Sequence, residues 1–348
     1  MGVFIGRIVE KDEMSTVIYS KDGLHILPIS SKHNPGDIVD SKDNLITRCY
    51  AKDFDINEII DKKRYYEKRF SYINKIESFF LDRGFRKVLT KKLKENLIKE
   101  TNINYIKTDA GYLTPSPEVE IKKLLSYGFD KLFELNFAYR NDYEDALHLK
   151  EFLILEWYRA MAKPEDIIED FRNLIITLNN SSSLFYQGKN INLKHIEYVT
   201  YNKLFEKISI DVENFNPEAI KNRFSIEGCL DRLDILDAVF ALKIEKTLGI
   251  DHPVVVYNFP KERANLAKIK DNFAQRYEFY IAGIELANCY NEENDYLKLK
   301  QRIKNYDKAF FHTMSLGIPQ SSGIAVGVDR LIMLLENRTK IFKSVTPK

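Results

Sequence analysis

The hydrophobic and polar positions of residues 1–50 alternate in short runs that predict a small all-β unit. The apolar runs read VFIGRIV, STVIYS, LHILPI, DIVD and LITRCYA, and the stretches KDG, NPGD and SKDN separate them. Because these breaks are rich in the residues that favour turns, the pattern predicts about five strands.

From residue 62 onward the chain mixes helical and strand periodicity. Residues 62–82 predict an amphipathic helix, because apolar side chains recur at steps of three and four at Tyr66, Phe70, Ile73, Ile76 and Phe80. Further helices are expected at 118–126, 163–180, 231–248 and 295–315. Strands are expected at LFELNFAYR, FLILEWYRAM, VVVYNFP and, as one long buried strand, YEFYIAGIELANCY. Without regular βαβ alternation, this order predicts an α+β fold with an antiparallel sheet flanked by helices.

We therefore expect two domains, a β module at 1–55 and a larger domain at 62–348. The module is shorter than a usual oligonucleotide-binding (OB) barrel, and its charges are mixed and its aromatic residues few. An OB-like unit trimmed in length is possible, but a nucleic-acid platform is poorly supported. A small packing or adaptor module is the better interpretation of residues 1–55.

Composition places the chain among ordinary globular proteins. Of its 348 residues, 44% are hydrophobic and 30% are charged, and the net charge of +2 does not point to a nucleic-acid partner. The start MGVFIGRIVEKDE turns acidic too early for a signal peptide, and no apolar run is long enough to cross a bilayer. Cys49, Cys229 and Cys289 form no paired motif, so neither a disulfide framework nor a zinc site is expected. We expect a cytoplasmic protein without a membrane partner.

The segment FAYRNDYEDALHLKEF combines groups that can hold a nucleotide. An arginine fork such as that of Arg140 binds phosphate or carboxylate oxygens in pairs, and Phe152 offers a face on which a base can stack. The alternative is an ordinary hairpin with a solvated tip.

The segment GIELANCYNE places acids within an apolar strand. Strand alternation predicts that Glu285, Ala287 and Cys289 share one face. Glu285 and Glu292, with Asn288 between them, suit a hard cation such as Mg²⁺ that bridges phosphate oxygens. A salt bridge at the strand end is the alternative.

Two further segments carry candidate chemistry. In TPSPE, two prolines set a rigid loop, and Glu118 begins a helix, where it can face an ammonium group or serve only the helix dipole. In GIAVGVDR, small residues alternate with apolar ones and lead to Arg330, and a strand without bulky side chains lets a ligand approach closely.

These segments, in this order, resemble class II aminoacyl-tRNA synthetases. GIAVGVDR resembles motif 3, and FAYRND with HLKEF resembles motif 2. TPSPE, FELNFAYRND, LEWYR and GIELANCYNE resemble in particular the lysyl-tRNA synthetase-like elongation factor P lysyltransferase family, over residues 62–348. The resemblance implies a homodimeric ligase that uses ATP and Mg²⁺. Such an enzyme activates a lysine-type amino acid as an adenylate and transfers it to a lysine of elongation factor P.

The resemblance also assigns roles to individual residues. Catalysis would rest on Arg140, Arg330 and Glu292, and Mg²⁺ on Glu285 and Glu292. The ATP-binding set would be Arg140, Asn141, Asp142, His148, Phe152, Glu285, Leu286, Gly327 and Arg330. The amino-acid pocket would be lined by Ser116, Pro117, Glu118, Tyr158, Glu292 and Ala325. Ala325 stands where lysyl-tRNA synthetases usually have glycine, which implies a pocket for (R)-β-lysine.

Four positions depart from the family's motifs, and they keep other functions open. They are Lys91 in place of a proline of motif 1, Asp142 in place of Glu, Leu149 in place of Asn, and Cys289 in place of Gly. One alternative is a catalytically weakened paralogue that acts as a binding or regulatory protein. The retained charges at Arg140, Glu285, Glu292 and Arg330 favour activity instead, because buried charges without a function are costly.

Two other ligases are also considered. A truncated lysyl-tRNA synthetase-like ligase acting on tRNA is disfavoured, because no sizeable basic anticodon-binding domain is evident. A synthetase-like asparagine synthetase fits the TPSPE and LEWYR segments less well.

Overall fold

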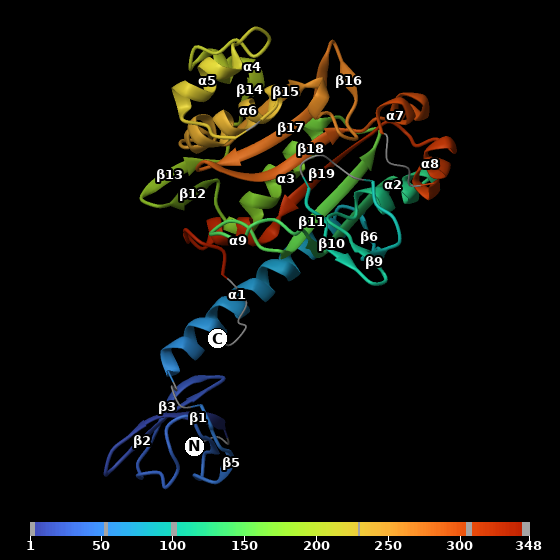
Figure 1. The fold of residues 1–348 in the computed structure, drawn as a ribbon. Coiled ribbons are helices and arrows are strands. Elements are labelled where there is room, and N and C mark those ends of the chain that lie inside the picture. Colours follow the sequence, from blue (N-terminus) through green and yellow to red (C-terminus); the bar gives the residue numbers. More distant parts are fainter. Residues whose placement is uncertain (1–3, 52–54, 99–102, 229, 304–307, 343–348) are drawn as a thin grey trace. The chain divides into compact units, whose positions relative to one another are not determined.

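The computed structural model describes residues 4–51, 55–98, 103–228, 230–303 and 308–342. The chain divides into two compact units, Met1–Ser71 and Tyr72–Lys348, and helix α1 (Ile56–Leu81) contains the boundary between them (Figure 1). No helix in the described ranges combines the length and the hydrophobicity that a membrane span requires. Cys49 and Cys289 are free thiols, and Cys229 lies outside the described residues.

The first unit contains the five strands expected from its alternation. They form one antiparallel sheet in the order β3-β2-β1-β4-β5. Their bounds are β1 Ile5–Lys11, β2 Thr16–Ser20, β3 Gly23–Leu27, β4 Ile38–Asp40 and β5 Leu45–Thr47. Ile8, Ile18, Leu27 and Val39 point to one face and form a small buried core. The all-β prediction for this segment is confirmed.

The second unit is built on a nine-stranded sheet (Figure 1). Its order is β14-β15-β17-β18-β19-β11-β10-β6, and β16 pairs with β17. Only the outer pairs β14–β15 and β6–β10 are parallel. The bounds are β6 Arg86–Lys87, β10 Lys131–Tyr139, β11 Glu151–Ala160, β14 Glu197–Thr200, β15 Val254–Pro260, β16 Ile269–Lys270, β17 Phe273–Ile281, β18 Ile284–Asn291 and β19 Ser321–Gly327. The α+β, antiparallel fold class is confirmed.

Helices and short sheets surround this central sheet. The helices are α2 Glu118–Ser126, α3 Pro164–Asn179, α4 Tyr201–Glu206, α5 Pro217–Phe224, α6 Arg232–Val239, α7 Tyr296–Arg302, α8 Lys308–Ser315 and α9 Val328–Leu335. A three-stranded sheet has the order β7-β9-β8 (Leu93–Lys94, Gly111–Leu113, Lys107–Thr108), and β12 (Ser183–Tyr186) pairs with β13 (Lys189–Asn192). Helix α3 lies against β18 and β19, and α2 lies against β11 and α8.

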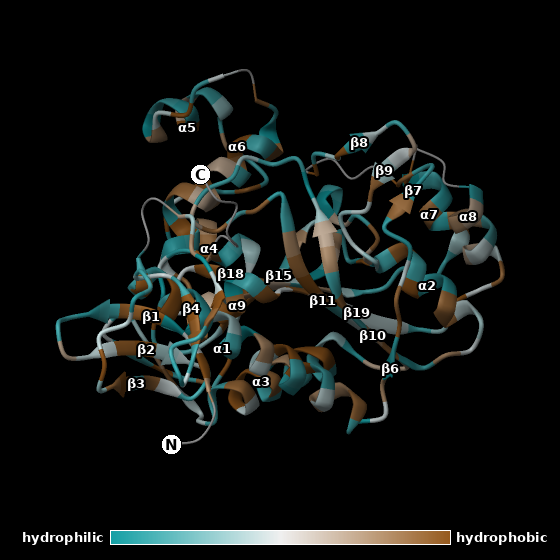
Figure 2. Cartoon of the chain, turned by 90° about the horizontal axis from the view of Figure 1, so that it is seen from below, coloured by the Kyte–Doolittle hydropathy of each residue, from teal (hydrophilic) through white to brown (hydrophobic). Residues whose placement is uncertain are grey.

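One face of the central sheet forms the core. Trp157 of β11 is fully buried, with its ring 4.9 Å from that of Phe80 in α1 and 6.1 Å from that of Phe171 in α3. The Phe171 ring lies 4.9 Å from that of Phe279 in β17. Strand β15 is hydrophobic along most of its length (Figure 2). Because this face is filled by helices and aromatic rings, the polar side chains of the same strands point to the opposite face.

Three local predictions require correction. The single long strand expected at 277–290 is a hairpin, because Ala282 and Gly283 take left-handed conformations (φ 53° and 71°) and turn the chain from β17 into β18. The helix expected at 231–248 is α6 followed by a π-helical turn at Phe240–Ile244 and a 3-10 turn at Glu245–Thr247. Phe70, expected on the apolar face of α1, is 58% exposed.

Candidate active site

The polar face of the sheet carries two rows of side chains across four neighbouring strands. Cross-strand pairing aligns Glu156, Ala325, Asn288 and Glu278 in one row, and Tyr158, Gly323, Tyr290 and Arg276 in the next. These residues come from β11, from the β17–β18 hairpin and from β19, which are separate segments of the sequence. The sheet therefore gathers an acid, a phenol and an arginine around the small residues of β19.

Gly323 is required by the packing of this face. A Cβ atom at this position would lie 2.1 Å from Cε1 and 2.2 Å from Cδ1 of Tyr158. At Gly327 a Cβ atom would meet only the side chain of Arg330, at 3.6 Å or more. The two glycines of GIAVGVDR therefore serve different purposes. Gly323 makes room for the ring of Tyr158, whereas Gly327 leaves space at a cavity.

A β-bulge decides where Glu285 points. The register between β17 and β18 pairs Phe279 with Ala287 and Tyr280 with Glu285, so Leu286 is an extra residue. The extra residue shifts the alternation, and Glu285 lines the same cavity as Asn288. The expectation that Glu285, Ala287 and Cys289 share one face is therefore wrong. Cys289 is 1% exposed and pairs with Ile324 on the core side of the sheet, so it adds no side chain to the site.

Two cavities adjoin on this face, and they share Arg140, Glu285, Asn288 and Ala325. The first, named here the sheet cavity, has a volume of about 230 Å³. Of the expected residues it contains Ser116, Glu118, Arg140, Tyr158, Glu285, Glu292 and Ala325. The second, the hairpin cavity, has a volume of about 150 Å³ and contains Arg140, Asp142, His148, Phe152, Glu285, Leu286, Ala325, Gly327 and Arg330. Pro117, which is buried, and Asn141, which is exposed, line neither cavity.

Glu156, which is not among the site residues expected from the sequence, lies in the sheet cavity and is fully buried. Its Oε1 accepts a hydrogen bond from Ser116 Oγ at 2.6 Å, and its Oε2 accepts one from the Tyr158 hydroxyl at 3.2 Å. Burial, together with the nearby charge of Glu118, raises the pKa of Glu156 to about 8. The available signal was an acid in the middle of the apolar strand FLILEWYRAM.

Lys122 is a second buried residue beside this cavity that the sequence did not predict. Its side chain is 1% exposed, and Nζ lies 2.6 Å from Glu118 Oε1 and 2.6 Å from Glu292 Oε2. Burial lowers the pKa of Lys122, but the charges of Glu118 and Glu292 outweigh burial and raise it. Burial likewise raises the pKa of Glu292 to about 8, although Lys122 opposes the shift. Glu292 Oε1 is buried and has no hydrogen-bond partner among the described residues.

The acids of the sheet cavity exceed the cations available to them. Lys122 is shared by Glu118 and Glu292, and no cation bonds to Glu156 within the described residues. Two of the three arginines that line the cavity have acidic partners of their own: Arg276 pairs with Glu278, and Arg263 NH2 lies 3.0 Å from Asp234 and 2.6 Å from Asp237. The third, Arg140, also lines the hairpin cavity. Because buried carboxylates need a positive partner, this cavity is suited to ammonium groups.

The hairpin cavity combines two arginines and an aromatic ring with the acids Asp142, Glu285 and Asp329. The Arg140 guanidinium lies 5.3 Å from the centre of the Phe152 ring, and its Nε is buried without a hydrogen-bond partner within the described part of the chain. Arg330 donates from Nε to Leu147 O at 3.0 Å and from NH1 to Glu285 O at 2.8 Å. Arg330 thereby ties the β10–β11 loop to β18. Two arginines beside an aromatic ring suit a nucleotide with phosphate groups.

The loop between β10 and β11 is ordered by its own polar groups. Asp145 Oδ1 accepts from the backbone N–H groups of Leu147 and His148, and it lies 2.9 Å from His148 Nδ1. Asp142 Oδ1 accepts from Asn104 Nδ2 at 2.9 Å. His148 is exposed at the mouth of the cavity, where it can reach a phosphate.

The donors for Mg²⁺ fit in part. Glu285 lines both cavities and Glu292 Oε1 is unpartnered, but Glu292 Oε2 is committed to Lys122. Three or more His, Cys, Asp or Glu side chains do not converge into a metal site anywhere in the described ranges. A hard cation would therefore need phosphate oxygens to complete its ligands.

Leu149 and Lys91 are two of the residues that depart from the family motifs. Leu149 lines the hairpin cavity and offers it only an apolar contact. Lys91 is exposed, in the segment that leads into β7.

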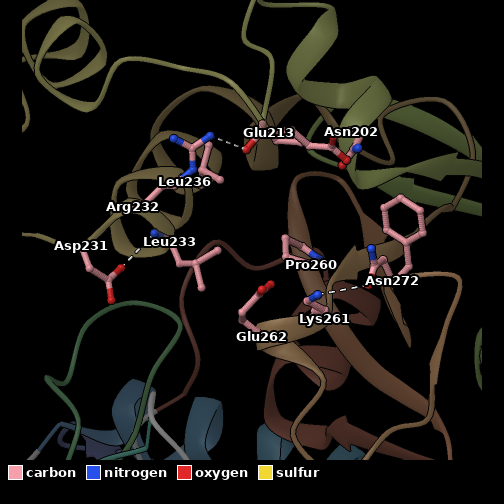
Figure 3. A pocket seen from close by; sticks show the side chains of 12 residues that line it. Asn202, Glu213, Asp231, Arg232, Leu233, Leu236, Pro260, Lys261, Glu262 and Asn272 are labelled. Atoms are coloured by element: carbon pink, nitrogen blue, oxygen red, sulfur yellow. Dashed lines mark hydrogen bonds between the residues drawn. The ribbon is translucent and has the colours of Figure 1, made fainter.

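A larger cavity of about 530 Å³ lies between α6 and the turn that joins β16 to β17 (Figure 3). Figure 3 shows the side chains that line it, among them Leu233, Leu236, Pro260, Glu213 and Glu262. None of the expected site residues lines this cavity. The chemistry-bearing side chains gather in the smaller cavities on the sheet.

Comparison with known proteins gives a family and relatives. A family model for class II tRNA synthetases (D, K and N) matches residues 57–346. The elongation factor P--(R)-beta-lysine ligase of Hamiltonella defensa is 30% identical over 302 residues, which cover 78% of this chain and 90% of that protein. The protein of the same name from Haemophilus influenzae is 30% identical over 304 residues, covering 79% and 91%. The lysine--tRNA ligase of Sulfolobus acidocaldarius is 31% identical over 333 residues, covering 85% of this chain and 65% of that protein.

Proposed function

The chain belongs to the class II (D, K and N) tRNA synthetase family, and from this premise we propose that it activates a lysine-type amino acid with ATP and transfers it to a lysine of elongation factor P. The observation that carries the proposal is the charge of the sheet cavity, where Glu118 and Glu292 share Lys122 and no cation bonds to Glu156 among the described residues. An amino acid with two ammonium groups supplies the missing positive charges. The names of the bacterial relatives support the acceptor.

In the first step the two cavities hold the two substrates next to each other. The ammonium groups of the amino acid bind the acids of the sheet cavity, and its carboxylate points toward Arg140, which borders both cavities. ATP lies in the hairpin cavity with its base on Phe152 and its phosphates near Arg140 and Arg330. A carboxylate oxygen attacks the α-phosphorus, and pyrophosphate leaves. Catalysis comes from orientation and from neutralisation of the phosphate charge, without a protein nucleophile.

We propose that Glu285 and Glu292 Oε1 contribute oxygen ligands to Mg²⁺. When bound, the ion neutralises charge on the phosphates of ATP. Lys122 has the complementary task of holding Glu292 and Glu118 in place from behind.

In the second step the acceptor amine attacks the carbonyl carbon of the adenylate. A C–N bond forms, the bond from the carbonyl carbon to the phosphate oxygen breaks, AMP leaves, and the amine loses a proton. Ala325 lies on the floor of both cavities in the row of Glu156 and Asn288. Its methyl group raises the floor beside Glu156, which favours (R)-β-lysine, whose amine is displaced by one carbon. We place this reaction in the cytoplasm, carried out by a homodimer.

Amino-acid-dependent ATP–pyrophosphate exchange tests the first step. We expect exchange with (R)-β-lysine or α-lysine, little with the other common amino acids, and loss of exchange in Arg330→Ala. Exchange with no amino acid, from folded protein that still binds ATP, would refute the ligase and favour a binding protein with this fold.

The acceptor is tested separately, by incubating the enzyme with labelled amino acid, ATP and either elongation factor P or tRNA. We expect an amide-linked label on the protein that survives mild base. A base-labile label on tRNA would instead identify an aminoacyl-tRNA ligase. The matched control is elongation factor P whose target lysine is replaced by arginine.

A further inference from the structure

Behind Glu156 the sheet carries a second buried carboxylate. Glu134 of β10 is directly opposite Glu156 of β11 in the strand register, and both side chains are fully buried. Residues that are paired in this way place their side chains on the same face of the sheet, with Cβ atoms about 4.5–5.5 Å apart. Glu134 lines neither the sheet cavity nor the hairpin cavity, so it does not touch a ligand there.

Glu134 has a cationic partner and two further hydrogen-bond donors. Its Oε1 accepts from Lys92 Nζ at 2.7 Å, from the Thr90 backbone N–H at 3.1 Å and from Asn136 Nδ2 at 3.1 Å. All three of these donors, one of them a cation, bond to the same oxygen. Its other oxygen, Oε2, is buried and has no hydrogen-bond partner among the described residues. An orphaned buried acceptor of this kind is unusual and calls for a donor.

The surroundings of Glu156 are those of a carboxyl group that needs a proton or a cation. Its two hydrogen-bond donors, Ser116 and Tyr158, are neutral hydroxyl groups. The charged groups that face it are the acids Glu118 from α2 and Glu134 from β10. Two buried carboxylates in adjacent positions do not both ionise without a cation between them.

We propose that Glu156 carries a proton before substrate binds, favoured by the carboxylate of Glu134 opposite it, and that an ammonium group binding at Glu156 expels this proton to solvent. The balance is simple: a carboxyl group and a free ammonium ion become a carboxylate–ammonium pair and one released proton. The inference rests on the proposed function, because it describes how the site recognises the amine of that substrate. Glu134 is a positioning residue that acts through Glu156. Its carboxylate forms an ion pair with Lys92.

The proposal explains how Glu156 remains buried beside Glu118 and opposite Glu134 without a cation of its own. Burial and these two neighbouring charges raise the pKa of Glu156 to about 8, which agrees with a proton being present at neutral pH. A ligand whose side chain is as long as that of lysine but neutral has no positive charge to take the place of the proton on Glu156. The cavity therefore distinguishes an ammonium group from an apolar group of the same shape.

Isothermal titration calorimetry of the full chain with α-lysine or (R)-β-lysine tests the proposal. Titrations at pH 7 in phosphate and in Tris, which have different ionisation enthalpies, give the number of protons released on binding. We expect wild type to release about one proton more than Glu156→Gln, since only wild type has a titrating carboxyl at that position. In Glu134→Gln the release should also fall, because the amide removes the neighbouring charge that favours the proton.

Controls separate this role from a structural one. Glu262→Gln, an acid at the rim of the large cavity, should release the same number of protons as wild type. Glu134→Asp keeps the carboxylate and should restore part of the release, and the KM for ATP in exchange should stay near the wild-type value in every variant. If Glu134→Gln does not fold, wild type is titrated from pH 6 to 9 instead, and the number of released protons should fall as the pH passes about 8.

The outcomes distinguish two failures. Lysine that binds with equal proton release in wild type, Glu156→Gln and Glu134→Gln would overturn this inference and leave the proposed function standing. A release that does not change with pH would do the same. If neither lysine binds nor supports exchange, the proposed function fails and this inference fails with it.

Discussion

Substituting Gly323 by alanine tests the packing argument for the site, because the structure predicts its effect from distances. The new Cβ atom would lie 2.1, 2.2 and 2.7 Å from three ring atoms of Tyr158, whereas carbon atoms in contact lie about 3.5–4.0 Å apart. The ring must therefore move by more than 1 Å, by roughly the difference between these distances.

Tyr158 has little freedom to make that movement. Its side chain is 3% exposed, its hydroxyl bonds to Glu156, and it packs in a cluster with Ile121, Leu125 and Phe310. Overpacking of this kind costs about 1–3 kcal/mol. The opposing effect, a stiffer unfolded chain when glycine becomes alanine, is worth only about 0.4–1 kcal/mol. Net destabilisation is therefore expected.

Two assays measure the result. Thermal unfolding of Gly323→Ala should show a lower midpoint, by about 2–4 °C for each kcal/mol lost in a domain of this size. In pyrophosphate exchange the KM for the lysine-type substrate should rise roughly 5- to 150-fold, which is the equivalent of 1–3 kcal/mol. The KM for ATP should change little, because Gly323 and Tyr158 line the sheet cavity and not the hairpin cavity.

Gly327→Ala is the matched control on the same strand. Its φ is −74°, and the new Cβ atom meets only the Arg330 side chain at 3.6 Å or more, so the substitution should not lower stability. Any effect should fall on ATP, since Gly327 lines the hairpin cavity. A Gly323→Ala variant with wild-type stability and wild-type KM for the amino acid would refute the reasoning, as would greater destabilisation by Gly327→Ala.

Three further predictions address charge. Glu156 has a folded pKa of about 8, raised from 4.5, so it favours the folded state below pH 4.5 and loses that contribution as the pH rises toward 8. Urea unfolding of Glu156→Gln should show a flatter dependence on pH between 5 and 8 than wild type, and equal slopes would contradict the burial argument. Lys122→Met leaves Glu118 and Glu292 without their shared cation and should lower the free energy of unfolding by about 3–5 kcal/mol at pH 8, measured in urea. Arg330→Lys keeps the charge but cannot reach both backbone carbonyls, so the KM for ATP should rise while lysine binding, followed by calorimetry, stays unchanged.

Much of the site could be identified from the sequence because its segments are short and chemically distinctive. The resemblance of TPSPE, LEWYR, GIELANCYNE and GIAVGVDR to known motifs selected Ser116, Glu118, Tyr158 and Arg330, and the structure places all four at two adjoining cavities. The sequence did not single out Glu156, although LEWYR contains it. The alternation along the strand predicts on which face of the sheet the Glu156 side chain lies. Only the pairing of Glu156 with Ala325 shows that this face borders a cavity.

Other features depend on contacts between distant segments. The bulge at Leu286 turns Glu285 toward Asn288, and no local pattern announces it, because a bulge exists only against the partner strand. Lys122 resembles any helical lysine until α2 packs beside Glu292. Cys289 was counted as a change in the substrate strand, but it points into the core.

By itself the sequence determined the alternation of the strands, the α+β class, the small β sheet near the N-terminus and the short motifs that carry arginines and acids. These are local properties, set by the spacing of side chains along one segment. The tertiary structure alone decided which acids meet: Glu134 opposite Glu156, Glu118 and Glu292 on one lysine, and Tyr158 against Gly323. The physical reason is that charge balance and close packing depend on how separate strands and helices are placed against one another, and that placement is fixed only when the whole sheet assembles.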